Sequence, residues 1–123
     1  MQHNIVWFDI PATDLDRAIA FYSAVLGAPV VKEAVGESIF GWLPTPDGGR
    51  MGCICVVPGF TPSGDGIMIY LGVNGRIRDA VTAVRAHGGV VQTDVHSIGV
   101  YGFRAEVLDS EGNCIALHSE TDV

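Results

Sequence analysis

The sequence predicts an α+β fold built from two βαβββ modules, and three observations carry this prediction. Each half of the 123-residue chain holds an apolar strand, an amphipathic helix that stops near glycine, and then further strands. The apolar positions of the two helices match, and the turn DGGR at residues 47–50 parallels DSEG at residues 109–112. Repeated units too short to bury their own apolar faces must pack on one another. We therefore expect an eight-stranded, incompletely closed barrel-like mixed sheet with both helices outside.

The first module begins with an apolar strand at residues 5–10, followed by a helix at residues 14–26. The ends of this helix are marked in the sequence. Thr13 with Asp16 three residues later resembles a capping box, and Gly27 suits the left-handed position just beyond the last turn. Three short strands complete the module, at residues 30–33, 38–43 and 51–57.

The second module repeats this order with a strand at residues 67–73 and a helix at residues 75–87 that stops at Gly88. Arg76 and Arg85 fall on the face of this helix that we expect to be solvated. Three strands again follow, at residues 90–95, 101–108 and 113–118.

A single domain is expected over residues 1–123, because the chain is short and 48% of it is hydrophobic. Its two modules span about residues 1–58 and 67–120. Residues 59–66, rich in Gly, Pro and Ser, form the linker between them.

Charge and cysteine content restrict the partners and the compartment. The chain carries 7 basic and 14 acidic residues, for a net charge of −7, which repels phosphate backbones and anionic lipid headgroups. No basic, apolar leader or bilayer-length apolar run is present. Three cysteines, an odd number, fit reduced thiols better than a disulfide framework. We expect a cytoplasmic protein without nucleic-acid or membrane partners.

Strand parity predicts which side chains line a shared concavity, because successive strand residues point to opposite faces. The uniformly aliphatic faces, such as Ile115 with Leu117, should pack on the helices, which leaves the mixed faces for a ligand. Aromatic and polar side chains on one concave face are typical of small-molecule sites. The predicted ligand-binding residues are Trp7, Cys53, Cys55, Met68, Tyr70 and His118.

Two segments, DLDRAIAFYSAVLG at residues 14–27 and DSEGNCIALH at residues 109–118, carry a family resemblance. With the repeat, they make the chain similar to the vicinal oxygen chelate superfamily, which includes glyoxalase I, bleomycin-resistance proteins and extradiol dioxygenases. This resemblance implies the same βαβββ duplication, a small-molecule ligand and a homodimer. It does not select a reaction, since one fold hosts many chemistries.

Enzymes of this superfamily hold a divalent metal with His, Glu or Gln side chains from the first, fourth, fifth and eighth strands. Matched strand by strand, those positions fall at Ile5, Cys53, Met68 and Ala116. Three of them, Ile5, Met68 and Ala116, offer no oxygen, nitrogen or thiolate ligand. A thiolate site using the cysteines and His118 is an alternative, but a C-x-C pair in an extended strand needs distortion to grip one ion. We therefore expect no metal and no cofactor, with the cysteines acting as small buried hydrophobes.

The leading hypothesis is a glyoxalase/bleomycin-resistance/dioxygenase family protein that binds a small molecule in a metal-free concave cavity. The alternative is an enzyme: a lyase, isomerase or dioxygenase whose metal has unrecognised ligands, or a metal-free enzyme with His118 as acid–base group. For His118 itself, a strand-end residue bonded to backbone is an equally good interpretation. A third hypothesis is an accessory domain that acts through protein partners.

Overall fold

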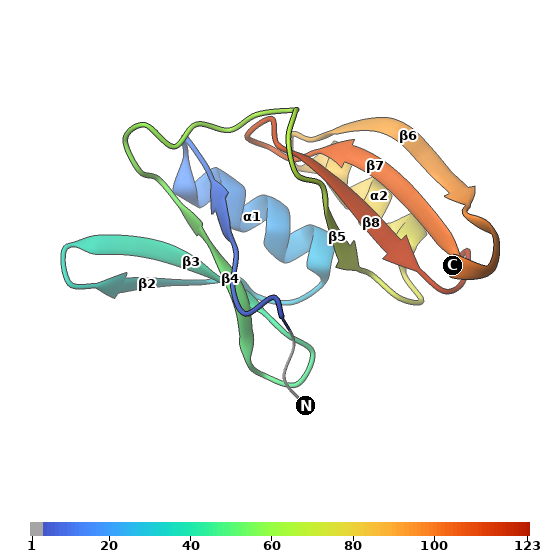
Figure 1. Cartoon of the computed structure of the whole chain (residues 1–123), viewed down its shortest axis with the longest axis horizontal. Coiled ribbons are helices and arrows are strands. Elements are labelled where there is room, and N and C mark those ends of the chain that lie inside the picture. Colours follow the sequence, from blue (N-terminus) through green and yellow to red (C-terminus); the bar gives the residue numbers. More distant parts are fainter. Residues whose placement is uncertain (1–3) are drawn as a thin grey trace.

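The computed structural model describes residues 4–123 and confirms two βαβββ modules in an open, barrel-like α+β fold (Figure 1). The first module comprises β1 (Asp9–Pro11), α1 (Leu15–Leu26), β2 (Val31–Val35), β3 (Ser38–Pro44) and β4 (Arg50–Cys55). The second comprises β5 (Ile69–Gly72), α2 (Ile77–Ala86), β6 (Val90–Ser97), a 3₁₀ turn η1 (Gly99–Tyr101), β7 (Phe103–Leu108) and β8 (Cys114–Ser119).

The eight strands form two four-stranded mixed sheets of equivalent topology. Their orders are β1-β4-β3-β2 and β5-β8-β7-β6, with β1 parallel to β4 and β5 parallel to β8. The other neighbours are antiparallel. Helix α1 packs against β3 and β4, helix α2 packs against β6, β7 and β8, and the two helices contact each other. One face of each sheet is therefore covered by a helix of its own module.

Two strands are shorter than predicted, and a third predicted strand is interrupted. The first strand begins at Asp9, because Ile5 and Val6 lie outside the ladder and are 79% and 83% exposed. The fifth begins at Ile69. The predicted strand at residues 101–108 starts only at Phe103, after Gly102, which has a φ of 102°. A Cβ atom at Gly102 would lie 2.5 Å from the Ser119 carbonyl oxygen, so this chain reversal requires glycine.

Apolar burial follows the predicted parity. The side chains directed at the helices, among them Ile10, Ile54 and Leu71, are at most 3% exposed. They join the buried faces of both helices in one hydrophobic cluster. The predicted aliphatic faces are therefore confirmed as the core within the strands. Val6, Val56 and Ile67, predicted to share these faces, lie outside the strands and are 83%, 50% and 92% exposed.

The turn at residues 109–113 ties the second module to the first. The Glu111 side chain accepts hydrogen bonds from the Thr13 and Asp14 backbone amides, both at 2.9 Å. Asn113 Nδ2 donates to the Pro11 carbonyl at 2.9 Å. The N-cap of α1 is Asp14, whose side chain accepts a hydrogen bond from the Arg17 amide. The Thr13 hydroxyl instead donates to Glu111, so the predicted cap at Thr13 is wrong by one residue. These contacts hold β1 and β8 on either side of a cleft.

Candidate functional site

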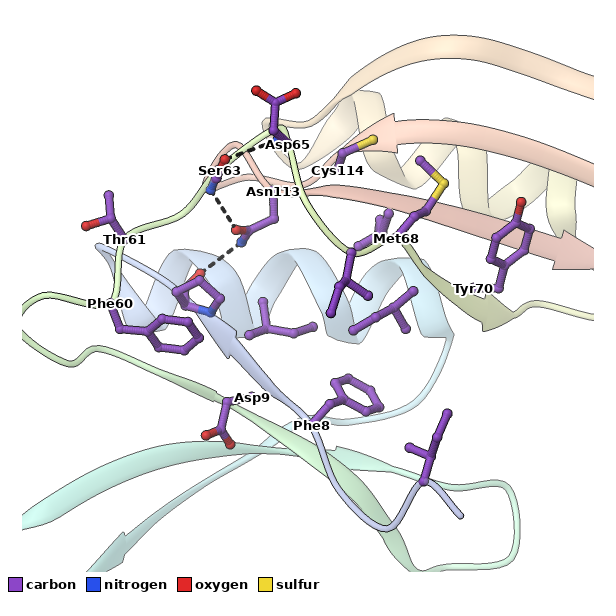
Figure 2. Close-up of a pocket in the computed structure, with 16 residues that line it drawn as sticks. Phe8, Asp9, Phe60, Thr61, Ser63, Asp65, Met68, Tyr70, Asn113 and Cys114 are labelled. Carbon is purple, nitrogen blue, oxygen red and sulfur yellow. Dashed lines mark hydrogen bonds between the residues drawn. The ribbon is translucent and has the colours of Figure 1, made fainter. Parts of the chain in front are cut away.

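A cleft of about 790 Å³ lies between the two modules, bounded by β1, β5 and the segment that connects β4 to β5. Figure 2 shows Phe8 and Phe60 on one side of this cleft and Met68 and Tyr70, carried by the chain around β5, on the other. The apolar lining residues are Ile5, Phe8, Ile10, Pro11, Phe60, Ile67, Met68, Ile69 and Ile115. The volume and lining suit a small organic molecule.

The polar groups of the cleft are few and mostly acidic or neutral. Asp9 and Asp65 are exposed members of the lining, and none of the sixteen lining residues that the structure describes is Lys, Arg or His. The side chain of Asn113 is used in hydrogen bonds within the protein. Its Oδ1 accepts from the Ser63 amide at 3.1 Å, and its Nδ2 donates to the Pro11 carbonyl oxygen. The connecting segment is thereby anchored to the wall of the cleft (Figure 2). The cleft is electrostatically suited to neutral or positively charged ligands.

Tyr70 links the cleft to a basic cluster that the sequence analysis missed. The Tyr70 hydroxyl accepts a hydrogen bond from Arg104 Nη1 at 2.8 Å. Arg104 Nε in turn donates to His96 Nε2 at 3.3 Å. Arg104 and His96 are register partners on β7 and β6, but bulges in β6 separate that pair from the preceding ones. Parity counted through a bulge fails, so the sequence pattern could not place His96 beside Arg104.

His118 lies on β8 opposite Arg104 and beside Gly72 on β5, and it is not among the residues lining the cleft. Its Nε2 atom is 2.6 Å from the Tyr101 carbonyl oxygen. Since a carbonyl only accepts, Nε2 carries the hydrogen and cannot act as a base while this bond is kept. The arrangement is that of a strand-end histidine bonded to backbone, and the acid–base role of His118 stays a prediction.

Trp7, Cys53 and Cys55 gather around Asp9 on the face of the first sheet that α1 leaves uncovered. Trp7 Nε1 and Cys53 Sγ both donate to Asp9 Oδ1, at 3.2 and 3.1 Å. Cys55 Sγ lies 3.8 Å from the Ile10 carbonyl oxygen. Burial, with the hydrogen bond to Asp9, raises the pKa of Cys53 to about 12, and burial also raises the pKa of Cys55. Both groups are therefore neutral thiols near pH 7.

The six predicted binding residues thus lie in three locations: the cleft, the adjoining open face of the first sheet, and the end of β8, where His118 lies. Met68 and Tyr70 line the cleft, whereas Trp7, Cys53 and Cys55 lie on the sheet face. Asp9 belongs to both places, because it lines the cleft and accepts from Trp7 and Cys53.

The strand register also corrects the positions at which the resemblance puts metal ligands. Cys53 pairs with Asp9 rather than Ile5, and Ala116 pairs with Tyr70 rather than Met68. The second module therefore offers only Tyr70 and Ala116 to such a site: an alanine has no ligand atom, and a phenol does not replace His, Glu or Gln. The residues present do not fit the four-strand metal site.

Comparison with known proteins gives the family. A sequence profile of the Glyoxalase/Bleomycin resistance protein/Dioxygenase superfamily matches residues 4–117. The chain belongs to this superfamily. No curated protein matches the chain.

Solved structures from the glyoxalase superfamily share the fold. A glyoxalase/bleomycin resistance protein from Albidiferax ferrireducens T118 is 20% identical, with a TM-score of 0.71 over 93% of this chain and 96% of that one. A glyoxalase/bleomycin resistance protein/dioxygenase family enzyme from Burkholderia phytofirmans PsJN is 17% identical, with a TM-score of 0.72 over 95% and 98%. The trypanothione-dependent glyoxalase I of Leishmania major is 23% identical, with a TM-score of 0.66 over 97% and 88%. At these identities the likeness concerns the fold.

Among the described residues, neither helix of this superfamily member has the length and apolar character needed to span a bilayer.

Proposed function

We propose that this protein binds a small, largely apolar compound in the cleft between its modules, without the four-strand metal site of its superfamily. The observation that supports this most directly is the cleft itself, with a volume of about 790 Å³ and a mainly apolar lining that includes Met68 and Tyr70. Volumes of this order hold drug-sized molecules, and apolar walls with a few polar groups are typical of their sites.

The polar groups narrow the class of compound to one that carries a positive charge. Asp9 and Asp65 supply negative charge, and Phe8, Phe60 and Tyr70 supply aromatic rings. A ring face attracts a cation by roughly 0.5–1 kcal/mol at an exposed site. The net charge of −7 adds a long-range attraction for cations. An aromatic ammonium compound combines the apolar body and the charge that these groups favour.

A cytoplasmic location and a homodimeric state complete the proposal. All three cysteines are free, which fits a reducing compartment. The uncovered face of the first sheet supports self-association, because a sheet with apolar side chains on its open face gains stability when another surface covers them.

Thermal denaturation with three matched probes tests the binding proposal: benzyltrimethylammonium, benzyl alcohol and phenylacetate. We expect the cation to raise the melting temperature most and the anion least, since any ligand of the native state stabilises it by mass action. Tyr70→Ala should weaken binding of the cation about tenfold, through loss of one ring and its contact area.

Tyr101→Ala is the matched control, because Tyr101 is an exposed tyrosine outside the cleft lining. It should leave binding unchanged. Equal effects of the two substitutions, or stabilisation by none of the probes, would remove the cleft as the ligand site.

A further inference from the structure

Three side chains with metal-ligand atoms converge on the open face of the first sheet. Asp9 on β1 and Cys53 on β4 are register partners in parallel strands, and Cys55 lies two residues beyond Cys53 on the same face. The Asp9 carboxylate oxygen and the two Sγ atoms all lie within 4.8 Å of one another. Among the described residues, no other group of three such side chains meets this distance.

We propose that Asp9, Cys53 and Cys55 form a binding site for one thiophilic divalent cation of the Zn²⁺ class. Binding the ion displaces the protons of both thiols to solvent, because the thiolate is the ligand form. Two thiolate ligands select zinc, cadmium or cobalt over magnesium, calcium or manganese, which prefer oxygen. The site adjoins the organic-ligand cleft through Asp9, which lines it, whereas neither cysteine does.

The observed spacing requires only a small adjustment to close around an ion. Zn–S bonds of about 2.3 Å at a tetrahedral angle place two sulfurs about 3.8 Å apart. The Sγ atoms are already within 4.8 Å, and Cys53 Sγ is 3.1 Å from Asp9 Oδ1. The expected distortion of a C-x-C pair is thus modest here. The C-x-C pair supplies only two ligands, and the strand register adds a third, Asp9, from the neighbouring strand.

Burial and an outer hydrogen bond favour stable binding of an ion at this cluster. Cys53 and Cys55 are 5% and 3% exposed, whereas Asp9 is exposed, so an ion enters from the carboxylate side. Trp7 Nε1 donates to Asp9 Oδ1 and orients the carboxylate, as outer hydrogen bonds do around metal ligands. Three protein ligands leave a fourth tetrahedral position for water.

This assignment differs from the superfamily's metal site and from our expectation of no metal. The superfamily's ion is held by strands of both modules through His, Glu or Gln. Asp9 and Cys53 stand at the first- and fourth-strand positions of that site, but Cys55 does not, and β5 and β8 supply no ligand to the site proposed here. Sequence parity placed both cysteines on the open face but could not show that Asp9 stands next to Cys53.

Titration of the reduced, metal-free protein with Co²⁺ tests the proposal directly. We expect a thiolate-to-cobalt charge-transfer band that saturates at one ion per chain, is abolished by Zn²⁺ or Cd²⁺, and is insensitive to Mg²⁺. Cys53→Ala and Cys55→Ala should each weaken Co²⁺ binding about 100-fold, because each substitution removes one of only two thiolate ligands. Asp9→Asn should weaken it about tenfold.

Cys114→Ala is the matched control, because Cys114 is the remaining thiol and bonds Gln92 rather than the cluster. It should bind Co²⁺ like the wild type. A band that survives Cys53→Ala and Cys55→Ala but is lost in Cys114→Ala would overturn the assignment, as would the absence of any band.

Thermal denaturation with Zn²⁺ covers the case in which a cysteine variant folds poorly. Zn²⁺ should raise the melting temperature of the wild type and of Cys114→Ala, and should raise it less in Asp9→Asn, whose exposed side chain is not needed for the core. Equal protection of the wild type and Asp9→Asn would contradict the site.

Discussion

At the scale of single residues, Glu111 shows that part of the motif behind the family resemblance has a structural task. Its side chain is fully buried and accepts from the Thr13 and Asp14 amides and from Arg17 Nε, the last at 2.7 Å. Burial alone raises the pKa of Glu111, but the hydrogen bonds from Arg17 and the two amides outweigh it and lower the pKa to about 2. The carboxylate thus caps α1 from the other module.

Glu111→Gln should lower the free energy of unfolding at pH 7 by about 2 kcal/mol, since hydrogen bonds to a charged group are lost. The pKa is lower in the folded state than the ordinary 4.5, so this stabilisation is complete above about pH 4.5 and is lost as the pH falls toward 2. Urea unfolding of wild type and variant should therefore converge in acid. Glu37→Gln, at an exposed turn between β2 and β3, is the control and should have no effect at either pH.

Residue parity predicted the faces of the strands well and the site only in part. Alternation in residues 67–73 correctly sorted Leu71 into the core and Tyr70 onto the open face, because parity is a local property of a strand. The position of Asp9 beside Cys53 depends on the stagger between two strands that are far apart in sequence. Such a stagger is set by packing and by the intervening turns, so no local pattern reveals it.

At the scale of elements, α1 is held at both ends by the second module. Gly27 closes its C-terminus with a φ of 67°, as the sequence predicted, but the last turn contains no basic residue. Arg76 supplies the missing charge: its Nη1 donates to the Val25 carbonyl at 2.5 Å and its Nη2 to the Ala24 carbonyl at 3.4 Å. The expectation that Arg76 is on a solvated face is therefore wrong, because a contact between helices is invisible in the pattern of one helix.

Arg76→Ala should lower the free energy of unfolding by about 1–2 kcal/mol, through loss of hydrogen bonds to helix-end carbonyls and of a favourable interaction with the helix dipole. Arg85→Ala provides the comparison, since the Arg85 side chain is more than half exposed and its contact with Asp94 is 3.6 Å long. That surface pair should contribute less than about 0.5 kcal/mol. Equal losses in the two variants, measured by urea unfolding, would show that Arg76 does not cap α1.

At the scale of the whole molecule, the two sheets do not close on each other within the chain. Each presents one face to its helix, and the β2–β3 hairpin extends away from the rest of the fold (Figure 1). The register groups Val31 and Val35 with Phe40 and Trp42 on the open face of the first sheet. The sequence predicts an incompletely closed sheet and, through the family resemblance, a homodimer. It does not predict which surface the two chains share, since contacts between chains leave no periodic signal within one chain.

Light scattering should therefore report a particle of about twice the 13.0 kDa chain mass at micromolar concentration. Val35 is 53% exposed in the single chain, so Val35→Glu costs the isolated chain little, yet it places a charge on the apolar face that a second copy would cover. This variant should sediment as a folded monomer with an unchanged circular dichroism spectrum. Lys32→Glu, on the opposite side of the same strand, is the control and should leave the dimer intact, because residues that alternate along a strand face opposite ways. A wild type that stays monomeric at all concentrations would mean that the apolar face is tolerated in water and that the cleft is complete within one chain.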